Sequence, residues 1–293
     1  MSDPRDLLGR HDLRPRKSLG QNFLIDPSAP GRIADCAGLS AEDVVLEVGA
    51  GVGTLTADLA ARAGRVIAVE TDPALAEVLS AEMAPWQHVR VVRGDILTLD
   101  PALLLSVPEE ALGQPLWGRR LTHYHVVANL PYYVTNAVVR HLLEARVRPL
   151  QLVLTVQREV AERMVALPGN MSLLAVSVQF YGRPELCLRL RRGAFYPPPK
   201  VESAVVRIRT YEEPPFAVAD VERFFRMARA GFFQRRKQLR NSLSANLVLD
   251  PEAVAKALSG QDIDPTRRAE TLSIAEWGRV NAGLSPLLDG ADM

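Results

Sequence analysis

The stretch Asp43-Val44-Val45-Leu46-Glu47-Val48-Gly49-Ala50-Gly51-Val52-Gly53-Thr54-Leu55-Thr56 decides the fold of the first part of the chain. Its β-branched run predicts a buried strand over 44–48, and the apolar spacing after Thr54 predicts a helix. Three glycines at every second position lie between them. Such a turn lets backbone approach a ligand where side chains would clash, and a helix N-terminus follows it. The stretch therefore predicts a nucleotide-type site in an α/β fold.

The spacing of these glycines distinguishes two kinds of ligand. The dinucleotide fingerprint is Gly-x-Gly-x-x-Gly, whereas residues 47–53 follow the pattern Glu-x-Gly-x-Gly-x-Gly. The difference points away from a pyrophosphate and towards S-adenosylmethionine, whose amino-acid end and ribose lie over such a turn. An ordinary glycine-rich strand-to-helix turn is the alternative, because short motifs also recur without a ligand.

Bulk composition narrows the class of protein. The 293 residues can hold two domains, and 47% hydrophobic with 24% charged residues is typical of a globular chain. No apolar run approaches the roughly 20 residues that span a bilayer, and residues 1–17 carry no secretory signal. The two cysteines, Cys36 and Cys187, lie far apart and match no metal spacing. We therefore expect a cytoplasmic protein with reduced thiols, no membrane span and no metal.

The net charge of +1 hides a strong separation of charge along the chain. Residues 41–110 contain 12 acidic and 4 basic residues, whereas residues 183–240 contain 14 basic and 6 acidic residues. This separation predicts an acidic catalytic core and a surface that meets a polyanion. Solvated surface charge is the alternative.

Acidic residues follow three successive predicted strands. Strands are expected over 44–48, 65–70 and 88–92, and Glu47, Glu70 and Asp95 stand at or after their ends. Glu70 follows Gly51 by 19 residues, where a carboxylate accepts hydrogen bonds from ribose hydroxyls. Asp95 would accept from the exocyclic amine of adenine. Because open parallel sheets bind ligands at their carboxyl edge, the three together indicate a ligand site.

A fourth strand, over 124–128, runs directly into Asn129-Leu130-Pro131-Tyr132. The Asn129 amide oxygen and a backbone carbonyl form an acceptor pair for an –NH2 group, and Tyr132 offers a flat face for a base. A plain strand-to-helix corner is the alternative. After a glycine turn of this kind, the tetrapeptide is typical of amino methylation of adenine, cytosine or glutamine.

The other segments complete an α/β sheet with an antiparallel edge. Residues 1–17 are predicted to be a mobile basic arm, and residues 100–120 a long connection. Phe195 begins a stiff proline loop and could face a base opposite Tyr132 or simply plug the loop. Helices are expected over 31–37, 135–145 and 159–166, and strands over 150–156, 175–181, 186–190 and 203–209.

A linker at 212–215 separates the first domain, 1–212, from a small helical domain, 213–293. One helix is predicted over 221–243, with Phe224, Phe225, Ala228, Phe232 and Leu239 on one face. No acidic residue interrupts 226–240, which favours RNA binding over a solvated helix face. The predicted RNA-binding residues are Arg226, Arg229, Phe233, Arg235, Arg236, Lys237 and Arg240.

Five motifs occur in order along the chain: 21–24 (Gln-Asn-Phe-Leu), 47–53, 129–132, 195–201 (Phe-Tyr-Pro-Pro-Pro-Lys-Val) and 233–243 (Phe-Gln-Arg-Arg-Lys-Gln-Leu-Arg-Asn-Ser-Leu). On these motifs the chain resembles the KsgA family of small-subunit ribosomal RNA adenine dimethyltransferases over nearly its whole length. The resemblance implies a Rossmann-like sheet that binds S-adenosylmethionine, mostly parallel with an antiparallel edge, beside a small all-α domain.

The resemblance also implies roles for particular residues. The family substrate is a pair of adjacent adenosines in a hairpin loop near the 3′ end of 16S ribosomal RNA, within a small-subunit assembly intermediate, and we expect a monomeric enzyme. The residues implied to hold the target base are Asn129, Leu130, Pro131, Tyr132 and Phe195. The residues implied to bind the cofactor are Gln21, Asn22, Leu24, Gly49, Gly51, Glu70, Asp95 and Asn129.

Two features depart from the family pattern. Related chains usually carry Tyr-Gly where this chain has Leu173-Leu174, and the connection over 100–120 is longer than usual. Three other functions stay open: a 23S ribosomal RNA adenine methyltransferase of the antibiotic-resistance type, an assembly factor that acts by binding alone, and a DNA adenine methyltransferase. The motif over 233–243 argues against the first, and the intact 129–132 motif argues against the second.

Overall fold

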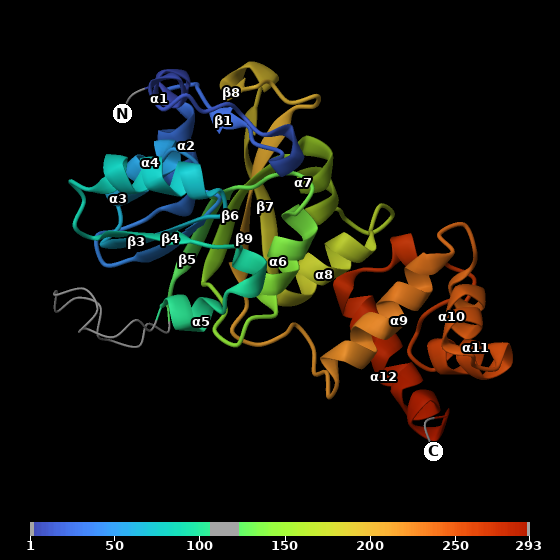
Figure 1. The fold of residues 1–293 in the computed structure, drawn as a ribbon. Coiled ribbons are helices and arrows are strands. Elements are labelled where there is room, and N and C mark those ends of the chain that lie inside the picture. Colours follow the sequence, from blue (N-terminus) through green and yellow to red (C-terminus); the bar gives the residue numbers. More distant parts are fainter. Residues whose placement is uncertain (1–2, 106–122, 292–293) are drawn as a thin grey trace. The chain divides into compact units, whose positions relative to one another are not determined.

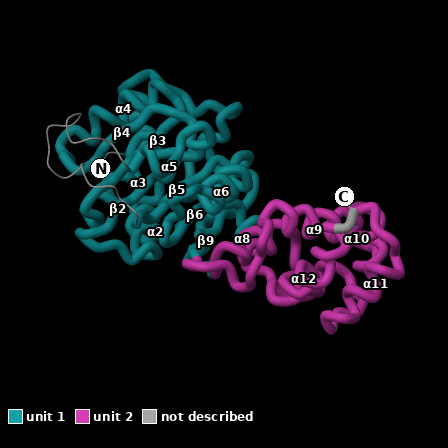
Figure 2. The backbone as a smooth tube through the Cα atoms, turned by 90° about the horizontal axis from the view of Figure 1, so that it is seen from below, with its two compact units in different colours: residues 1–161, 184–210 teal, residues 162–183, 211–293 magenta. Residues whose placement is uncertain are grey.

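The computed structural model describes residues 3–105 and 123–291, and the chain forms two compact units (Figures 1 and 2). The first unit comprises residues 1–161 and 184–210, and the second comprises residues 162–183 and 211–293. The second unit thus takes a segment, 162–183, that the sequence places in the first domain. Within the described ranges, none of the helices is both long and apolar enough to cross a membrane.

The first unit is built on a seven-stranded sheet with the order β4-β3-β2-β5-β6-β9-β7 (Figure 1). Neighbouring strands from β4 to β6 are parallel, and β9 pairs antiparallel with β6. The expected mostly parallel sheet with an antiparallel edge is confirmed. The strands are β2 (Val44–Val48), β3 (Arg65–Glu70), β4 (Val89–Arg93), β5 (His125–Asn129), β6 (Gln151–Gln157), β7 (Gly182–Leu190) and β9 (Ser203–Thr210).

Helices cover both faces of this sheet, because the strand order runs outward from β2 in both directions and the right-handed rule for crossovers then places helices on opposite faces. In Figure 1, α2, α3 and α4 lie together on one side and α6 lies on the other. Strand β2 is buried along all five residues, as expected for a strand covered on both faces. The helices are α2 (Ala29–Ala37), α3 (Thr54–Ala60), α4 (Pro73–Met83), α5 (Pro101–Leu104), α6 (Thr135–Leu143) and α7 (Arg158–Met164).

Two helix ends follow the sequence signals. The Asp72 carboxylate accepts a hydrogen bond from the Ala74 N–H at 3.1 Å, and Pro73 occupies the first turn of α4. Gly38 ends α2 in the left-handed conformation, with φ +59°. A two-stranded antiparallel pair, β1 (Phe23–Leu24) with β8 (Phe195–Tyr196), lies outside the main sheet. Most of the predicted connection over 100–120 lies outside the described residues.

The expectation of a mobile arm over residues 1–17 is wrong. Residues Pro4–Arg10 form α1, and the side chains of Leu7 and Leu8 are buried against Phe23 and Val52. Asp3 caps the helix by accepting from the Arg5 N–H at 2.8 Å. Seven residues are too few to show a helical period. Asp3 followed by Pro4 is nevertheless the same cap signal as Asp72 followed by Pro73, and the packing of the two leucines stabilises the helix.

The expectation of an antiparallel strand over 175–181 is also wrong. Residues Leu173–Tyr181 form α8, capped by Ser172, whose hydroxyl accepts from the Ala175 N–H at 3.2 Å. A helix buried on most sides shows no amphipathic period and resembles a buried strand in sequence. Within the second unit, Phe180 of α8 stacks on Phe224, with ring centroids 4.9 Å apart.

The single helix predicted over 221–243 is two helices, α9 (Val221–Phe233) and α10 (Leu239–Leu247). The five side chains predicted on its apolar face are nevertheless all buried: Phe224, Phe225, Ala228, Phe232 and Leu239. Residues 234–238 form a turn between the helices, and Gln234 leaves the helical conformation at φ −117° and ψ 71°. At the start of α10, the Leu239 and Arg240 N–H groups donate to the carbonyls of Arg267 and Pro265, at 2.6 and 3.2 Å.

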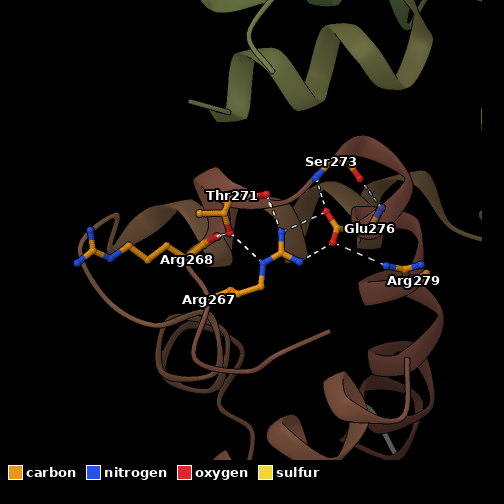
Figure 3. Close-up of polar contacts among 6 residues, drawn as sticks. All are labelled: Arg267, Arg268, Thr271, Ser273, Glu276 and Arg279. Carbon is orange, nitrogen blue, oxygen red and sulfur yellow. Dashed lines mark hydrogen bonds and ion pairs between the residues drawn. The ribbon is translucent and has the colours of Figure 1, made fainter. Parts of the chain in front are cut away.

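A polar network surrounds the Arg267 side chain (Figure 3). The Arg267 guanidinium donates to Glu276 Oε1 at 2.5 Å and to the Thr271 carbonyl at 2.7 Å. The Ser273 N–H donates to Glu276 Oε2 at 2.7 Å. These hydrogen bonds, that of Arg267 foremost, lower the pKa of Glu276 to about 2. The second unit is completed by α11 (Pro251–Ser259) and α12 (Ile274–Ala291).

Candidate active site

A cavity at the carboxyl ends of β2, β3 and β5 gathers residues from distant parts of the sequence. It opens to solvent, and the empty space is about 790 Å³ when this open mouth is included. The predicted site residues that line it are Gln21, Asn22, Leu24, Gly49, Gly51, Glu70, Asn129, Leu130, Pro131 and Tyr132. The parallel sheet therefore brings two of the motifs, over 47–53 and 129–132, to one place.

The glycine turn has a backbone that only glycine adopts without strain. Gly49, Gly51 and Gly53 have φ values of +73°, +60° and +89°, in the left-handed region that L side chains rarely enter. A Cβ on Gly51 would lie 3.2 Å from the Phe23 ring. The turn is thus fixed by conformation and by the close approach of β1.

Glu70 holds this turn in place. Its side chain is buried, and its two carboxylate oxygens accept from the Gly51 N–H and the Asp72 N–H, both at 2.8 Å. Burial raises the pKa of Glu70. A carboxylate oxygen can accept more than one hydrogen bond, so Glu70 can also receive hydroxyl groups of a ligand in the cavity.

Glu47 is a second buried carboxyl beside the cavity. It is 1% exposed, and its Oε2 has no hydrogen-bond partner among the residues that the structure describes. Burial, reinforced by the negative charge of Glu70, raises the pKa of Glu47 to about 8. An unpaired buried carboxyl costs free energy, and a ligand that brings a positive charge or N–H donors would relieve that cost.

Asn129 is oriented by the N-terminal segment. Its Nδ2 donates to the Asn22 carbonyl at 3.0 Å, and Asn22 Nδ2 donates to the Gly20 carbonyl at 2.9 Å. The amide of Asn129 therefore has its Oδ1 acceptor left for a ligand. Tyr132 is fixed by a 2.7 Å hydrogen bond between its hydroxyl and that of Ser203, so its ring keeps one orientation at the cavity wall.

Asp72 ties the N-terminal segment to the cavity. It is buried, and its Oδ2 accepts from Gln21 Nε2 at 3.2 Å and lies 3.3 Å from the Arg16 guanidinium. Gln21 Oε1 in turn accepts from the Arg16 N–H at 2.7 Å. In the sequence, Asp72 followed by Pro73 signals only a helix cap. Gln21 and Asp72 are 51 positions apart, and no sequence signal indicates their contact.

Two predicted site residues do not line the cavity. Phe195 is 2% exposed, pairs in register with Leu24 and belongs to the core cluster below it, a placement that fits the plug alternative. Asp95 is exposed and caps a short 3-10 turn, Ile96–Thr98, by accepting from the Leu97 N–H at 3.0 Å. The contact of each with a ligand stays a prediction.

Sequence reasoning missed one aromatic residue at the mouth of the cavity. Tyr133 lines it and is 64% exposed. A Cβ on Gly20 would lie 3.1 Å from the Tyr133 ring. The absence of a side chain at Gly20 therefore leaves room for this ring. The signal was available, because Tyr133 directly follows the motif over 129–132.

The predicted RNA-binding residues lie in the second unit, in α9, in the turn over 234–238 and in α10. All seven are exposed, and Phe233 is 75% exposed. A large apolar ring so exposed among cations is suited to stacking on an unpaired base. The two helices thus present a continuous basic sequence to solvent.

A parallel sheet with this glycine turn, buried carboxyls and Asn-Leu-Pro-Tyr turn around one cavity defines the class of Rossmann-like methyltransferases. A family model described as ribosomal RNA adenine dimethylase matches residues 13–283. The chain therefore belongs to the ribosomal RNA adenine dimethylase family, and it is an adenine dimethyltransferase of ribosomal RNA.

Individual relatives agree with this family. Proteins named ribosomal RNA small subunit methyltransferase A are similar to the chain in Dehalococcoides mccartyi (strain CBDB1), at 43% identity over 96% of this chain and 92% of that protein, and in Moorella thermoacetica, at 42% identity over 95% of each. Among solved structures, the 23S rRNA methyltransferase ErmE is similar, with a TM-score of 0.69 and 30% identity, covering 90% of this chain and 99% of that one.

Proposed function

We propose that this protein uses S-adenosylmethionine to dimethylate the exocyclic N6 amines of two adjacent adenosines in the hairpin loop near the 3′ end of 16S ribosomal RNA, during maturation of the 30S subunit. One observation carries the proposal: the glycine turn over 47–53 and the Asn-Leu-Pro-Tyr turn over 129–132 line the same cavity. The names of the relatives from Dehalococcoides and Moorella support the small subunit as the substrate.

The cavity fits the methyl donor. Glu70 would accept hydrogen bonds from the ribose hydroxyls of S-adenosylmethionine. The glycine turn leaves room for the amino-acid end of this cofactor to lie close to the protein backbone. The unpaired Glu47 Oε2 would face a positive ammonium. When bound, the cofactor supplies a methyl group made electrophilic by the adjacent sulfonium.

The chain's own task is to position the amine of the target base. Asn129 Oδ1 and the Leu130 carbonyl would accept its two hydrogens, which aligns the nitrogen lone pair with the methyl group. Tyr132 would stack on the purine ring, held by its bond to Ser203. The amine proton can leave to solvent after transfer, so positioning, rather than a strong base, supplies the rate.

The second unit would hold the RNA backbone. Its exposed cations, from Arg226 to Arg240, would neutralise phosphates, and Phe233 would stack on an unpaired base. We further propose that the enzyme acts in the cytoplasm, as a monomer, on an assembly intermediate of the small subunit.

The substitution Asn129→Ala tests the proposed role of the amide. We expect methyl transfer to unmethylated 30S subunits to fall by about 100-fold or more, because one positioning acceptor is lost. The measurement is incorporation of labelled methyl groups, with unchanged circular dichroism as the check on folding. Asn136→Ala, at an exposed position on α6, is the matched control. Transfer by the Asn129 variant within a few-fold of the native rate would refute the assignment.

The similarity to ErmE favours a second candidate, methylation of a 23S adenine. Assays with isolated small and large subunits, each from cells lacking the corresponding modification, separate the two. Methyl groups incorporated only into 16S RNA support the proposal, and incorporation only into 23S RNA replaces it. Binding to 30S subunits with no incorporation into either RNA would indicate an assembly factor that acts by binding alone.

A further inference from the structure

The two cysteines of the sequence lie near each other in the structure. Cys36 lies in α2 and Cys187 in the edge strand β7, both within the first unit. Both are half-buried, line the same surface cavity and pack against the same core cluster. The two side chains therefore lie close together in the structure. Sequence spacing gave no sign of this pair.

Arg207 of β9 fixes the geometry around the two thiols. Its guanidinium donates to the Cys36 carbonyl at 2.9 Å and forms an ion pair with Glu185 of β7. Arg207 therefore ties α2, β9 and β7 together at the cavity. A guanidinium near a thiol also stabilises its thiolate form.

The two thiols are chemically unequal. The hydrogen bond from Cys36 lowers the pKa of the Cys187 thiol to about 7, and the charge of Arg207 adds to this effect. The same hydrogen bond and burial raise the pKa of Cys36. The lowered pKa of Cys187 favours its thiolate, which is the reactive form, and the raised pKa of Cys36 favours its protonated thiol.

We propose that Cys36 and Cys187 form a dithiol oxidation site that closes to a disulfide when the protein meets a peroxide-class oxidant. The Cys187 thiolate attacks one peroxide oxygen, the O–O bond breaks and hydroxide leaves, so that Cys187 becomes a sulfenic acid. The Cys36 thiol then attacks that sulfur, and its proton leaves with the sulfenic hydroxyl as water. Each sulfur loses one electron, and the peroxide takes up both.

The disulfide would link α2 covalently to β7, and these two elements lie far apart in the sequence. A cross-link that closes so long a loop restricts the unfolded chain and stabilises the fold. The oxidised protein should therefore unfold at a higher temperature than the reduced protein, and a reducing agent should reverse the shift. The effect belongs to the first unit, which holds both cysteines.

The test exposes the full, reduced chain to hydrogen peroxide at pH 7, blocks remaining thiols with iodoacetamide and measures intact and peptide masses. We expect loss of two hydrogen atoms, no alkylation, a linked pair of peptides that contains both cysteines, and recovery with dithiothreitol. Cys36→Ser should accumulate a sulfenic acid on Cys187 that dimedone traps, since the serine hydroxyl still donates to the thiolate. Cys187→Ser, the matched control, should react several-fold more slowly.

Three results would overturn the proposal: two thiols that still alkylate after peroxide treatment, disulfides only between separate chains, or equal peroxide rates in the two single variants. Neither cysteine lines the cofactor cavity, so both reduced variants should methylate RNA at the native rate. Disulfide formation and methyl transfer are measured in separate assays. A negative result for the disulfide therefore does not contradict the proposed methyltransferase function, and the reverse also holds.

Discussion

At the scale of single residues, the site depends on two buried carboxyls with different surroundings. Glu70 accepts two backbone N–H groups, whereas Glu47 Oε2 has no partner among the described residues. Backbone donors favour the charged form and burial disfavours it. Glu47 therefore has its pKa raised to about 8, and at neutral pH the ligand-free protein keeps it mostly protonated.

This raised pKa predicts how stability changes with pH. Between about 4.5 and 8 the folded protein binds a proton at Glu47 that the unfolded chain has released, so the free energy of unfolding falls as pH rises, by up to about 1.4 kcal/mol per pH unit. Glu47→Gln should remove this slope, measured by urea unfolding from pH 5 to 8 without ligand. Glu42→Gln, at an exposed position, is the control. Equal slopes in both variants would contradict the assignment.

At the scale of elements, the break between α9 and α10 decides how the basic sequence is presented. Residues 234–238 form a turn between the two helices, and the Leu239 N–H at the start of α10 donates to the Arg267 carbonyl. The side chains of Arg235, Arg236 and Lys237 in this turn are exposed. The Arg267–Glu276 network therefore supports the proposed RNA contact indirectly, because it fixes the residue to which the start of α10 is bonded.

Arg236→Ala with Lys237→Ala should weaken binding to 30S subunits and lower the salt dependence of binding. Each lost phosphate contact should reduce the slope of log K against log salt by about 0.7–0.9. Affinity measured at several salt concentrations tests this, with Lys256→Ala, exposed on α11, as the control. A loss of cofactor affinity with an unchanged salt slope would mean that the second unit has another role.

Glu276→Gln should destabilise the second unit by about 1–2 kcal/mol at pH 7, because a charged hydrogen bond is lost. The pKa of Glu276 is lowered to about 2, so its contribution is full above about 4.5 and disappears as pH falls through about 2. Urea unfolding at pH 7 and pH 3 should show a smaller difference from native at pH 3. Glu252→Gln, exposed on α11, should change neither; an equal deficit at both pH values would contradict the ion-pair account.

At the scale of the whole molecule, acidic and basic residues are concentrated in different parts of the chain, and we propose different functions for these parts. Residues 41–110, with 12 acidic and 4 basic residues, supply about half of the residues that line the proposed cofactor cavity, whereas residues 183–240, with 14 basic and 6 acidic residues, contain the proposed RNA-binding segment. We therefore expect cofactor binding to depend on hydrogen bonds and burial, and RNA binding to depend on charge.

Salt should therefore separate the two binding events. Raising ionic strength should increase the KM for 30S subunits steeply, because counterion release drives RNA binding. The dissociation constant for the cofactor should change little, since its partners are buried and screened less. Calorimetry with S-adenosylhomocysteine and methyl-transfer kinetics over the same salt series provide the comparison. A parallel loss of both affinities would count against this division of tasks.

Neighbouring residues are enough to predict the sheet, the glycine turn and the order of the motifs. Strand runs such as 44–48 and 65–70 are apolar, β-branched and bounded by turn residues, and positive φ at Gly49 to Gly53 demands glycine. These are local properties, written in neighbouring residues. The carboxyl ends of parallel strands then bring Glu47, Glu70 and Asn129 together without further information.

Other features depend on contacts between distant residues. Helix α1 is stable because Leu7 and Leu8 pack into a core, α8 is a helix although its apolar run resembles a strand, and α10 begins where the Leu239 N–H donates to the Arg267 carbonyl. The meeting of Cys36 with Cys187 is of the same kind. Packing and long-range hydrogen bonds outweigh the fractions of a kcal/mol by which local propensities differ, so such features cannot be found from neighbouring residues alone.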